Sequence, residues 1–438
     1  MDRIGTSIEC SVAVLLRPLE ERCPTEDTRR SLADSDGASK PRGCACALLG
    51  VRIGPSHLLA VLPRGTRQSS FKRTRSRRLP SISSPWLMFT LVIALLVALC
   101  GFVSATPGLS LSISTPQSAA NIDELSVIST ITNTGKFPLR LLNHPQTVLS
   151  HLPTRIFDIR RGNSTPEFTG MIVHYSPDYV IQKNNSVDFT FLAPGQTSEH
   201  VHALAGVYNF TSTGVGEYEI KAYNRFHHVD VSGRVVSFDA GTQTTRFELT
   251  GGLARSQKLA LKNFGSFNQP TQMLQNGCTP DQQNMITEAV TYADQYISNA
   301  LTYLQTLSGD TPRYGTWFGM YDPQRVETVK SHYANSVGRA MLSTYDCMPD
   351  SCQDGSVAYV WRQQPGVIHF CGWFWTRPAY GSNSKAGTII HELTHFTGTE
   401  DYVYGGAGSM DLARSTPAVA VMNADNHMYF AENYPALQ

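Results

Sequence analysis

The 438-residue sequence has little charge and almost no excess of either sign. Charged residues make up 16% of the chain, and the formal net charge is +1 at pH 7. Nucleic-acid binders usually carry a strong basic surface, so the balance gives no indication of that function. The charge is unevenly placed, because the part from Thr271 onward is acidic and the remainder is basic. At this length the chain can form two or three domains.

Long apolar runs are scarce, and the clearest one spans Trp86 to Ala105. It ends in Val103-Ser104-Ala105, a small-residue pattern of the kind that a signal peptidase cuts. We therefore expect a signal peptide at 86–105 and a secreted, extracellular product. The run is also long enough to span a bilayer and follows a basic cluster, so a membrane-tethered protein is the alternative. Residues 1–85 are rich in Arg and Ser and lack a sustained period, which predicts a disordered basic leader or a gene-model extension.

Cysteines are few after this run. Only four follow it: Cys278, Cys347, Cys352 and Cys371. Four cysteines in an exported domain favour two disulfides, although spacing alone leaves three pairings open.

Residues 106–270 alternate apolar and polar positions in short runs that are separated by turn residues. This pattern predicts an all-β sandwich followed by a linker. N-glycosylation sequons occur here at Asn163, Asn184 and Asn209. The linker has no dibasic pair to mark a processing point, which we expect between about Gln257 and Asn276.

Residues 271–438 change to a helical pattern. Thr279 as an N-cap and Pro280 at the first helical position predict a long amphipathic helix, and a second helix is expected in "DPQRVETVKSHYANSV". "SVAYVWRQQPGVIHF" predicts two strands joined at a Pro-Gly turn. "SKAGTIIHELTH" predicts a third helix with Ser384 as its N-cap and Gly398 as its stop. The fold class expected here is mainly α (α+β) with a small β-hairpin or sheet.

The third helix carries His391, Glu392 and His395. Histidines four residues apart lie on one helix face, where both rings can reach one zinc ion. Glu392 can stand beside as a general base, which is the requirement for metal-assisted peptide hydrolysis. The H-E-x-x-H pattern is only moderately specific, and a solvated helix with two incidental histidines is the plain alternative.

Acidic residues follow the helix at once in "GTEDYVYG". Glu400 and Asp401 are both candidates for the third zinc ligand, because the intervening chain is long enough for either to reach back. Reach cannot choose between them.

The whole region from about Asn276 to Gln438 resembles the deuterolysin-like (aspzincin) zinc metallopeptidases. H-E-x-x-H followed by G-T-x-D-x-x-Y-G is similar to their signature, and blocks such as "TPRYGTWFG", "HFCGWFW" and "AVMNADNHMYFAENYPA" resemble the fungal peptidyl-lysine metalloendopeptidases. The resemblance implies one zinc ion per catalytic domain, a zincin-like fold and a prosegment before it. It further implies Asp401 as third ligand, Glu392 as general base, Tyr404 as donor to the oxyanion, and Cys278–Cys347 and Cys352–Cys371 as disulfides.

The sequence departs from that family in two places. About three residues are missing between His395 and Asp401, so the loop that delivers the third ligand is short. In the substrate pocket, the family has a pair of acids for a lysine ammonium, whereas this chain has Asp425 and Met428. We expect a weakened lysine preference, with broader cleavage as the alternative; Asp425 could instead act only as a helix-capping residue.

Together these features predict a secreted zinc metalloendopeptidase (a hydrolase) that is made as a zymogen. Its expected partners are protein or peptide substrates and its own propeptide as an intramolecular inhibitor, with no nucleic acid and no stable membrane association. The rival hypothesis is a catalytically impaired secreted scaffold or binding protein, in which the short loop has cost the zinc site.

Overall fold

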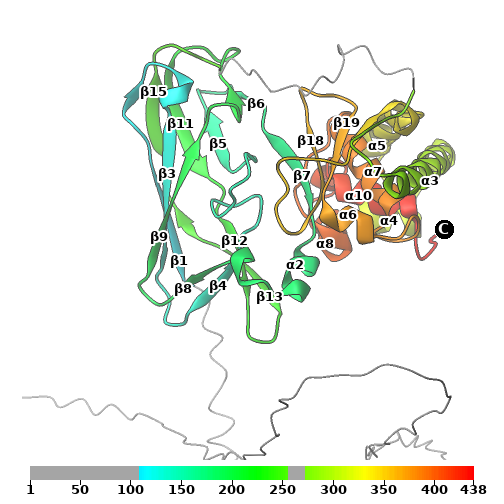
Figure 1. Cartoon of the computed structure of the whole chain (residues 1–438), viewed down its shortest axis with the longest axis horizontal. Coiled ribbons are helices and arrows are strands. Elements are labelled where there is room, and N and C mark those ends of the chain that lie inside the picture. Colours follow the sequence, from blue (N-terminus) through cyan, green and yellow to red (C-terminus); the bar gives the residue numbers. More distant parts are fainter. Residues whose placement is uncertain (1–107, 255–271) are drawn as a thin grey trace, which may run out of the picture. The chain divides into compact units, whose positions relative to one another are not determined.

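The computed structural model describes residues 108–254 and 272–438 (Figure 1). The predicted leader at 1–85, the predicted signal peptide at 86–105 and most of the predicted linker lie outside the described residues. All described residues belong to one compact unit, Phe89–Gln438.

The N-terminal region, 108–254, is rich in β-structure, as expected. One four-stranded sheet has the order β14 (Gly241–Thr242), β1 (Leu109–Ser114), β3 (Ser126–Asn133) and β9 (Thr197–Ala203). A second has the order β2 (Ser118–Ala119), β15 (Thr245–Leu249), β11 (Gly216–Ala222) and β5 (Phe157–Arg160). A third has the order β13 (Val235–Asp239), β12 (Arg225–Val229), β4 (Leu139–Leu142) and β8 (Phe189–Leu192). A two-stranded sheet joins β10 (Tyr208–Asn209) to β6 (Glu167–Phe168), and a short helix α2 spans Pro177–Lys183.

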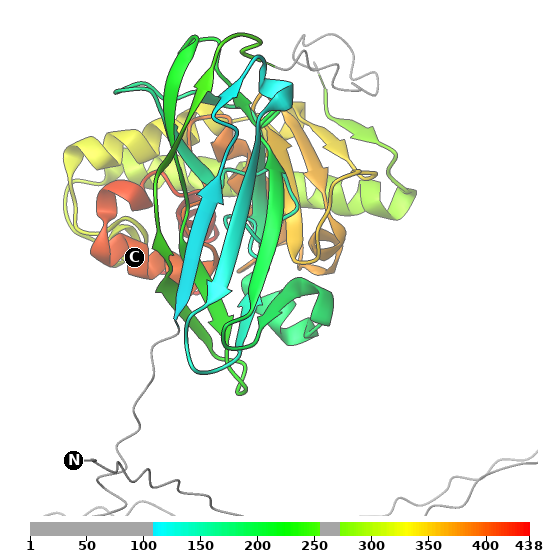
Figure 2. The ribbon, with the colours of Figure 1, turned by 90° about the vertical axis from the view of Figure 1, so that its left-hand side faces the viewer.

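Alternating burial explains why these runs form sheets. In β3, Val127 and Ile131 are buried while Ile128 is 40% exposed, and in β11 Tyr218 and Ile220 are buried between exposed neighbours. One face of β3 and one face of β11 therefore pack into the core, while their other faces point outward. Figure 2 shows β1 and β3 side by side, with their antiparallel register running from Leu109 opposite Asn133 to Ser114 opposite Ile128.

The C-terminal region, 272–438, is mainly helical. Thr279 closes a capping box with Gln282, and this cap begins the long helix predicted from the sequence, α3 (Pro280–Thr306). The other α-helices are α4 (Pro312–Phe318), α5 (Pro323–Ser336), α6 (Gly372–Thr376), α7 (Lys385–His395), α8 (Gly405–Ser415), α9 (Pro417–Ala420) and α10 (Ala424–Glu432). None of the helices within the described ranges has the length and apolarity needed to cross a membrane.

A five-stranded sheet lies beside these helices. Its order is β16 (Leu274–Asn276), β17 (Thr344–Asp346), β19 (Val367–Phe370), β18 (Ser356–Trp361) and β7 (Met171–Tyr175). The predicted hairpin is confirmed, because β18 and β19 pair antiparallel. The sequence did not predict that the N-terminal region supplies the fifth strand, β7, beside β18 (Figure 1).

Two disulfides fasten the loops of this region. Cys278 is bonded to Cys347 and Cys352 to Cys371, which are the pairs that the resemblance implies. Cys371 directly follows β19 and is the N-cap residue of α6.

Candidate metal centre and active site

Helix α7 carries His391, Glu392 and His395, and two side chains fix the position of its first turn. Ser384 accepts a hydrogen bond of 2.9 Å from the backbone N–H of Gly387, which caps the helix. Glu432, at the end of α10, accepts bonds of 2.8 Å from both the backbone N–H and the hydroxyl of Ser384. All eleven residues of α7 are buried, so the helix is held rigidly inside the region.

Helices α7 and α10 pack closely because α7 carries glycine at the point of contact. A Cβ built on Gly387 would clash with the Glu432 carboxylate and lie 2.9 Å from Cγ of Met428. Met428, which the sequence suggested for the substrate pocket, is fully buried at this contact.

The short loop after α7 brings Asp401 to both histidines. Its Oδ1 lies 3.1 Å from Nε2 of His391 and 3.5 Å from Nε2 of His395. Gly398 adopts a φ of 118°, a conformation that favours glycine, and the carbonyl of Thr399 lies 3.1 Å from Nδ1 of His395. The loop thus also holds the outer nitrogen of one histidine.

Glu400, the other candidate from the sequence, is directed elsewhere. Its Oε1 forms ion pairs with Arg155 at 3.2 Å and with Arg362 at 2.9 Å. The geometry therefore brings together His391, His395 and Asp401 and leaves Glu400 outside the cluster.

The donor set fits a zinc ion. One donor atom from each of these three residues lies within 4.8 Å of the others. In tetrahedral zinc sites with bonds of about 2.0–2.1 Å, neighbouring ligand atoms lie roughly 3.3 Å apart, close to the separations from Asp401. Nε2 of His395 and both carboxylate oxygens of Asp401 are buried and make no hydrogen bond within the described residues. Two imidazoles and one carboxylate leave a fourth position for water or substrate.

The electrostatics of the cluster favour a cation. Burial alone would lower the pKa of His391, but the carboxylates of Asp401 and Asp425 raise it to about 10. Burial lowers the pKa of His395 to about 4, against the opposing pull of Asp401. The two acids therefore create a place where positive charge is stabilised next to an imidazole that stays neutral.

Glu392 lies beside the cluster with its carboxylate free. The side chain is fully buried, and neither oxygen accepts a hydrogen bond from any described residue. Burial raises its pKa to about 8. A desolvated, unpaired carboxylate next to a metal site is suited to accept a proton.

Asp425 contacts His391 at the ring nitrogen that faces away from the metal cluster. Its Oδ1 lies 2.7 Å from Nδ1 of His391, on the ring edge away from Asp401, and its Oδ2 accepts a bond of 2.6 Å from the backbone N–H of Gly405. A carboxylate at the outer nitrogen of a zinc-binding histidine fixes the ring orientation. Asp425 is in the first turn of α10 but does not cap it; Asn423 is the N-cap residue. The sequence suggested Asp425 only as a pocket residue or helix cap.

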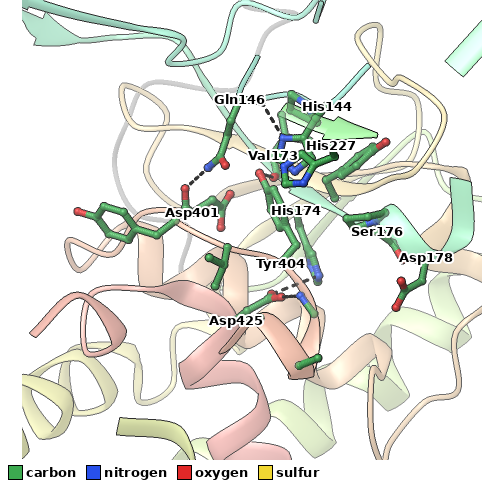
Figure 3. A pocket seen from close by; sticks show the side chains of 18 of the residues that line it. His144, Gln146, Val173, His174, Ser176, Asp178, His227, Asp401, Tyr404 and Asp425 are labelled. Atoms are coloured by element: carbon green, nitrogen blue, oxygen red, sulfur yellow. Dashed lines mark hydrogen bonds and ion pairs between the residues drawn. The ribbon is translucent and has the colours of Figure 1, made fainter. Parts of the chain in front are cut away.

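Three residues of the N-terminal region reach the site, and none of them could be recognised from the sequence. The Tyr404 hydroxyl donates a bond of 2.8 Å to the backbone carbonyl of Val173. His174 stacks on His391 with ring centroids 3.9 Å apart, and the amide of Gln146 donates to the backbone carbonyl of Asp401 (Figure 3). Burial raises the pKa of Tyr404 well above its usual value, so its hydroxyl remains a donor.

Comparison with known proteins identifies the family of the chain. The aspzincin family, described as lysine-specific metallo-endopeptidase, matches residues 303–432. The chain is 39% identical over 363 residues to a peptidyl-Lys metalloendopeptidase of Armillaria mellea, covering 81% of this chain and 99% of the relative. It is 39% identical over 355 residues to a peptidyl-Lys metalloendopeptidase of Grifola frondosa, with 80% and 99% covered. A solved zinc peptidase from Grifola frondosa is 42% identical with a TM-score of 0.35, covering 37% of this chain and 100% of that one. The chain belongs to the aspzincin family and is a zinc-dependent metalloendopeptidase.

Proposed function

We propose that the protein is a secreted zymogen whose C-terminal region, 271–438, hydrolyses peptide bonds with a weakened preference for lysine after the scissile bond. The observation that carries the proposal is the convergence of His391, His395 and Asp401 beside the unpaired carboxylate of Glu392. The named relatives are peptidyl-Lys metalloendopeptidases, which supports the same bond preference.

The metal ligands, Glu392 and Tyr404 have distinct roles in this proposal. His391, His395 and Asp401 would hold a zinc ion, which would supply Lewis acidity to the scissile carbonyl and to the attacking water. Glu392 takes a proton from that water, and its burial keeps it basic enough to do so near neutral pH. The Tyr404 hydroxyl donates a hydrogen bond to the oxygen on which negative charge develops.

Lysine preference would depend on Asp425. Asp425 lines a pocket together with Asp401 and Tyr404, whereas the second acidic position of the family pocket is the buried Met428. One carboxylate stabilises a substrate ammonium less than two would, and Asp425 also contacts His391. We therefore expect cleavage before lysine, with some cleavage elsewhere.

Export and latency complete the proposal. The apolar run at 86–105, the two disulfides and the sequons support a secreted product. Residues 106–270 would be a propeptide and linker, because β7 and Gln146 contact the candidate active site.

The test uses the full chain with a recognition sequence for a site-specific protease inserted between residues 255 and 271. Peptides released from a denatured protein are identified by mass spectrometry before and after that cut, with and without a chelator, and with Glu392→Gln as control. Chelator-sensitive peptides that begin with lysine and appear only after the cut support the proposal. Released peptides that begin with many different residues would contradict the proposed lysine preference. If the uncut chain is as active as the cut chain, the zymogen hypothesis is wrong. If neither form cleaves peptides, the rival hypothesis of a catalytically impaired scaffold protein is favoured.

A further inference from the structure

Strand β7 belongs to the N-terminal region but forms the edge strand of the five-stranded sheet, whose other four strands belong to the C-terminal region. It pairs antiparallel with β18, with Val173 opposite Tyr359 and His174 opposite Ala358. All five residues of β7 are buried. Peptides that bind to an exposed strand edge form this same backbone ladder, so β7 occupies the place that an extended peptide would take along β18.

The register of β7 brings one backbone carbonyl to the candidate oxyanion donor. The carbonyl oxygen of Val173 accepts the bond of 2.8 Å from Tyr404. Tyr404 is partly buried and has a single hydroxyl hydrogen to donate, so this bond occupies the donor while β7 is in place. The next peptide bond along the strand joins Val173 to His174.

The side chain of His174 fills the space between two site residues. Its ring lies face to face with His391 at an interplanar angle of 11°. Its Nε2 lies 3.6 Å from Oδ1 of Asp425 (Figure 3). One nitrogen of His174 lies within 4.8 Å of a nitrogen of His391 and an oxygen of Glu392. Only 2% of His174 is exposed, so no substrate side chain can share this position.

A second segment of the N-terminal region also contacts the site. The Gln146 amide donates to the backbone carbonyl of Asp401, and His144 lies beside Tyr404 with ring centroids 5.3 Å apart. Two separate segments of the N-terminal region therefore contact the site, β7 and the segment that contains His144 and Gln146.

We propose that β7 is a pseudosubstrate strand, in which the Val173–His174 peptide bond stands at the position of the scissile bond and His174 occupies the subsite for the residue after it. This inference rests on the proposed function. It attributes the inactivity of the uncut chain to the side chain of His174. An imidazole cannot present the compact ammonium of lysine on its flexible stem, so the strand is held without matching the preferred substrate.

The test is His174→Lys in the full, uncut chain loaded with zinc. If the register is that of a substrate, the chain cuts itself between positions 173 and 174. Water adds across one C–N bond, which leaves a carboxylate on Val173 and an amine on the residue at 174. We expect a new amino terminus at 174 by mass spectrometry, at a rate independent of protein concentration because the reaction is intramolecular.

Matched controls separate register from general exposure. Ser176→Lys places the same side chain two residues along the chain, and His200→Lys places it on β9; we expect no cut before either. Glu392→Gln added to His174→Lys should abolish the new terminus. The proposal is overturned if His174→Lys stays intact at 173–174 while, after the linker cut, it cleaves lysine-containing peptides.

A second variant reads the position of His174 without relying on catalysis. His174→Ala removes the ring that covers His391, so a chelator should extract zinc from the uncut chain at least tenfold faster than from the unmodified protein. Extraction rates equal within about twofold would overturn the proposal. If the linker-cut protein hydrolyses no peptide at all, the proposed function fails, and the extraction rates still decide where His174 lies.

Discussion

Oδ1 of Asp425 lies 2.7 Å from Nδ1 of His391, although 34 positions separate the two residues in the sequence. This contact fixes which nitrogen of His391 points toward His395 and Asp401. The same carboxylate faces His174 and holds the backbone of Gly405, so it links the metal site, the N-terminal strand and the start of α8.

Asp425→Ala should weaken zinc binding. Loss of a carboxylate behind a zinc-binding histidine typically lowers metal affinity about 10–100-fold. Competition with a chromophoric chelator measures the dissociation constant. Asp411→Ala, an acid in an exposed ion pair on α8, is the control and should leave it unchanged. Equal affinities for both variants would mean that Asp425 does not orient His391.

Tyr404→Phe should lower kcat with little change in KM or zinc content, measured after the linker has been cut. Removing one oxyanion donor typically costs about 10²–10³ in rate, and phenylalanine keeps the aromatic ring while it lacks only the hydroxyl. Tyr402→Phe, at a neighbouring tyrosine that is 47% exposed, is the matched control. A loss expressed only in KM would argue that Tyr404 binds substrate and does not stabilise the transition state.

Gly387→Ala should destabilise the protein by about 1–3 kcal/mol, the usual cost of overpacking. The added methyl group would press on Glu432 and Met428 where α7 meets α10. Gly406→Ala in α8 is the control, because its Cβ would have no neighbour closer than 3.7 Å. Alanine is also the better helix former there. Thermal unfolding compares the two, and equal shifts in Tm would contradict the close helix contact.

Glu432 should make stability depend on pH. Burial raises its pKa from 4.5 to about 7, against the hydrogen bonds from Ser384 that lower it. Because the folded state holds this proton more tightly than the unfolded state, its contribution favours folding at low pH and is lost as pH rises from about 4.5 to 7. Relative to Glu432→Gln, the metal-free protein should lose on the order of 2–3 kcal/mol over that window. Urea unfolding at pH 5 and pH 8 measures the difference, and a constant difference would show an unshifted carboxyl.

The parts of the site that the sequence predicts are those set by local geometry. The cap at Ser384, the helix through His391 and His395, and the acid in the following loop lie within about twenty residues of one another, where helix periodicity and reach apply. The sequence alone does not decide whether Glu400 or Asp401 is the third metal ligand. The choice depends on Arg155 and Arg362, which pair with Glu400 and lie far away in the chain.

The contacts that could not be predicted join distant segments. His174 is a single histidine in a short apolar strand, and nothing in "MIVHY" distinguishes it from a core residue. Glu432 looks like a surface acid near the C-terminus, but it accepts hydrogen bonds from the N-cap residue of a helix that begins 47 positions earlier. Tertiary pairing decided both, as it decided that β7 joins the catalytic sheet.

The pairing of β7 with β18 also bears on how the chain folds. During synthesis β7 emerges long before β18, so an edge-strand partner is already available when the catalytic region is made. An unpaired strand edge is a template for aggregation, and covering it early protects the chain while it folds. The N-terminal region would in this way serve as an intramolecular chaperone whose usefulness ends when the catalytic region has folded.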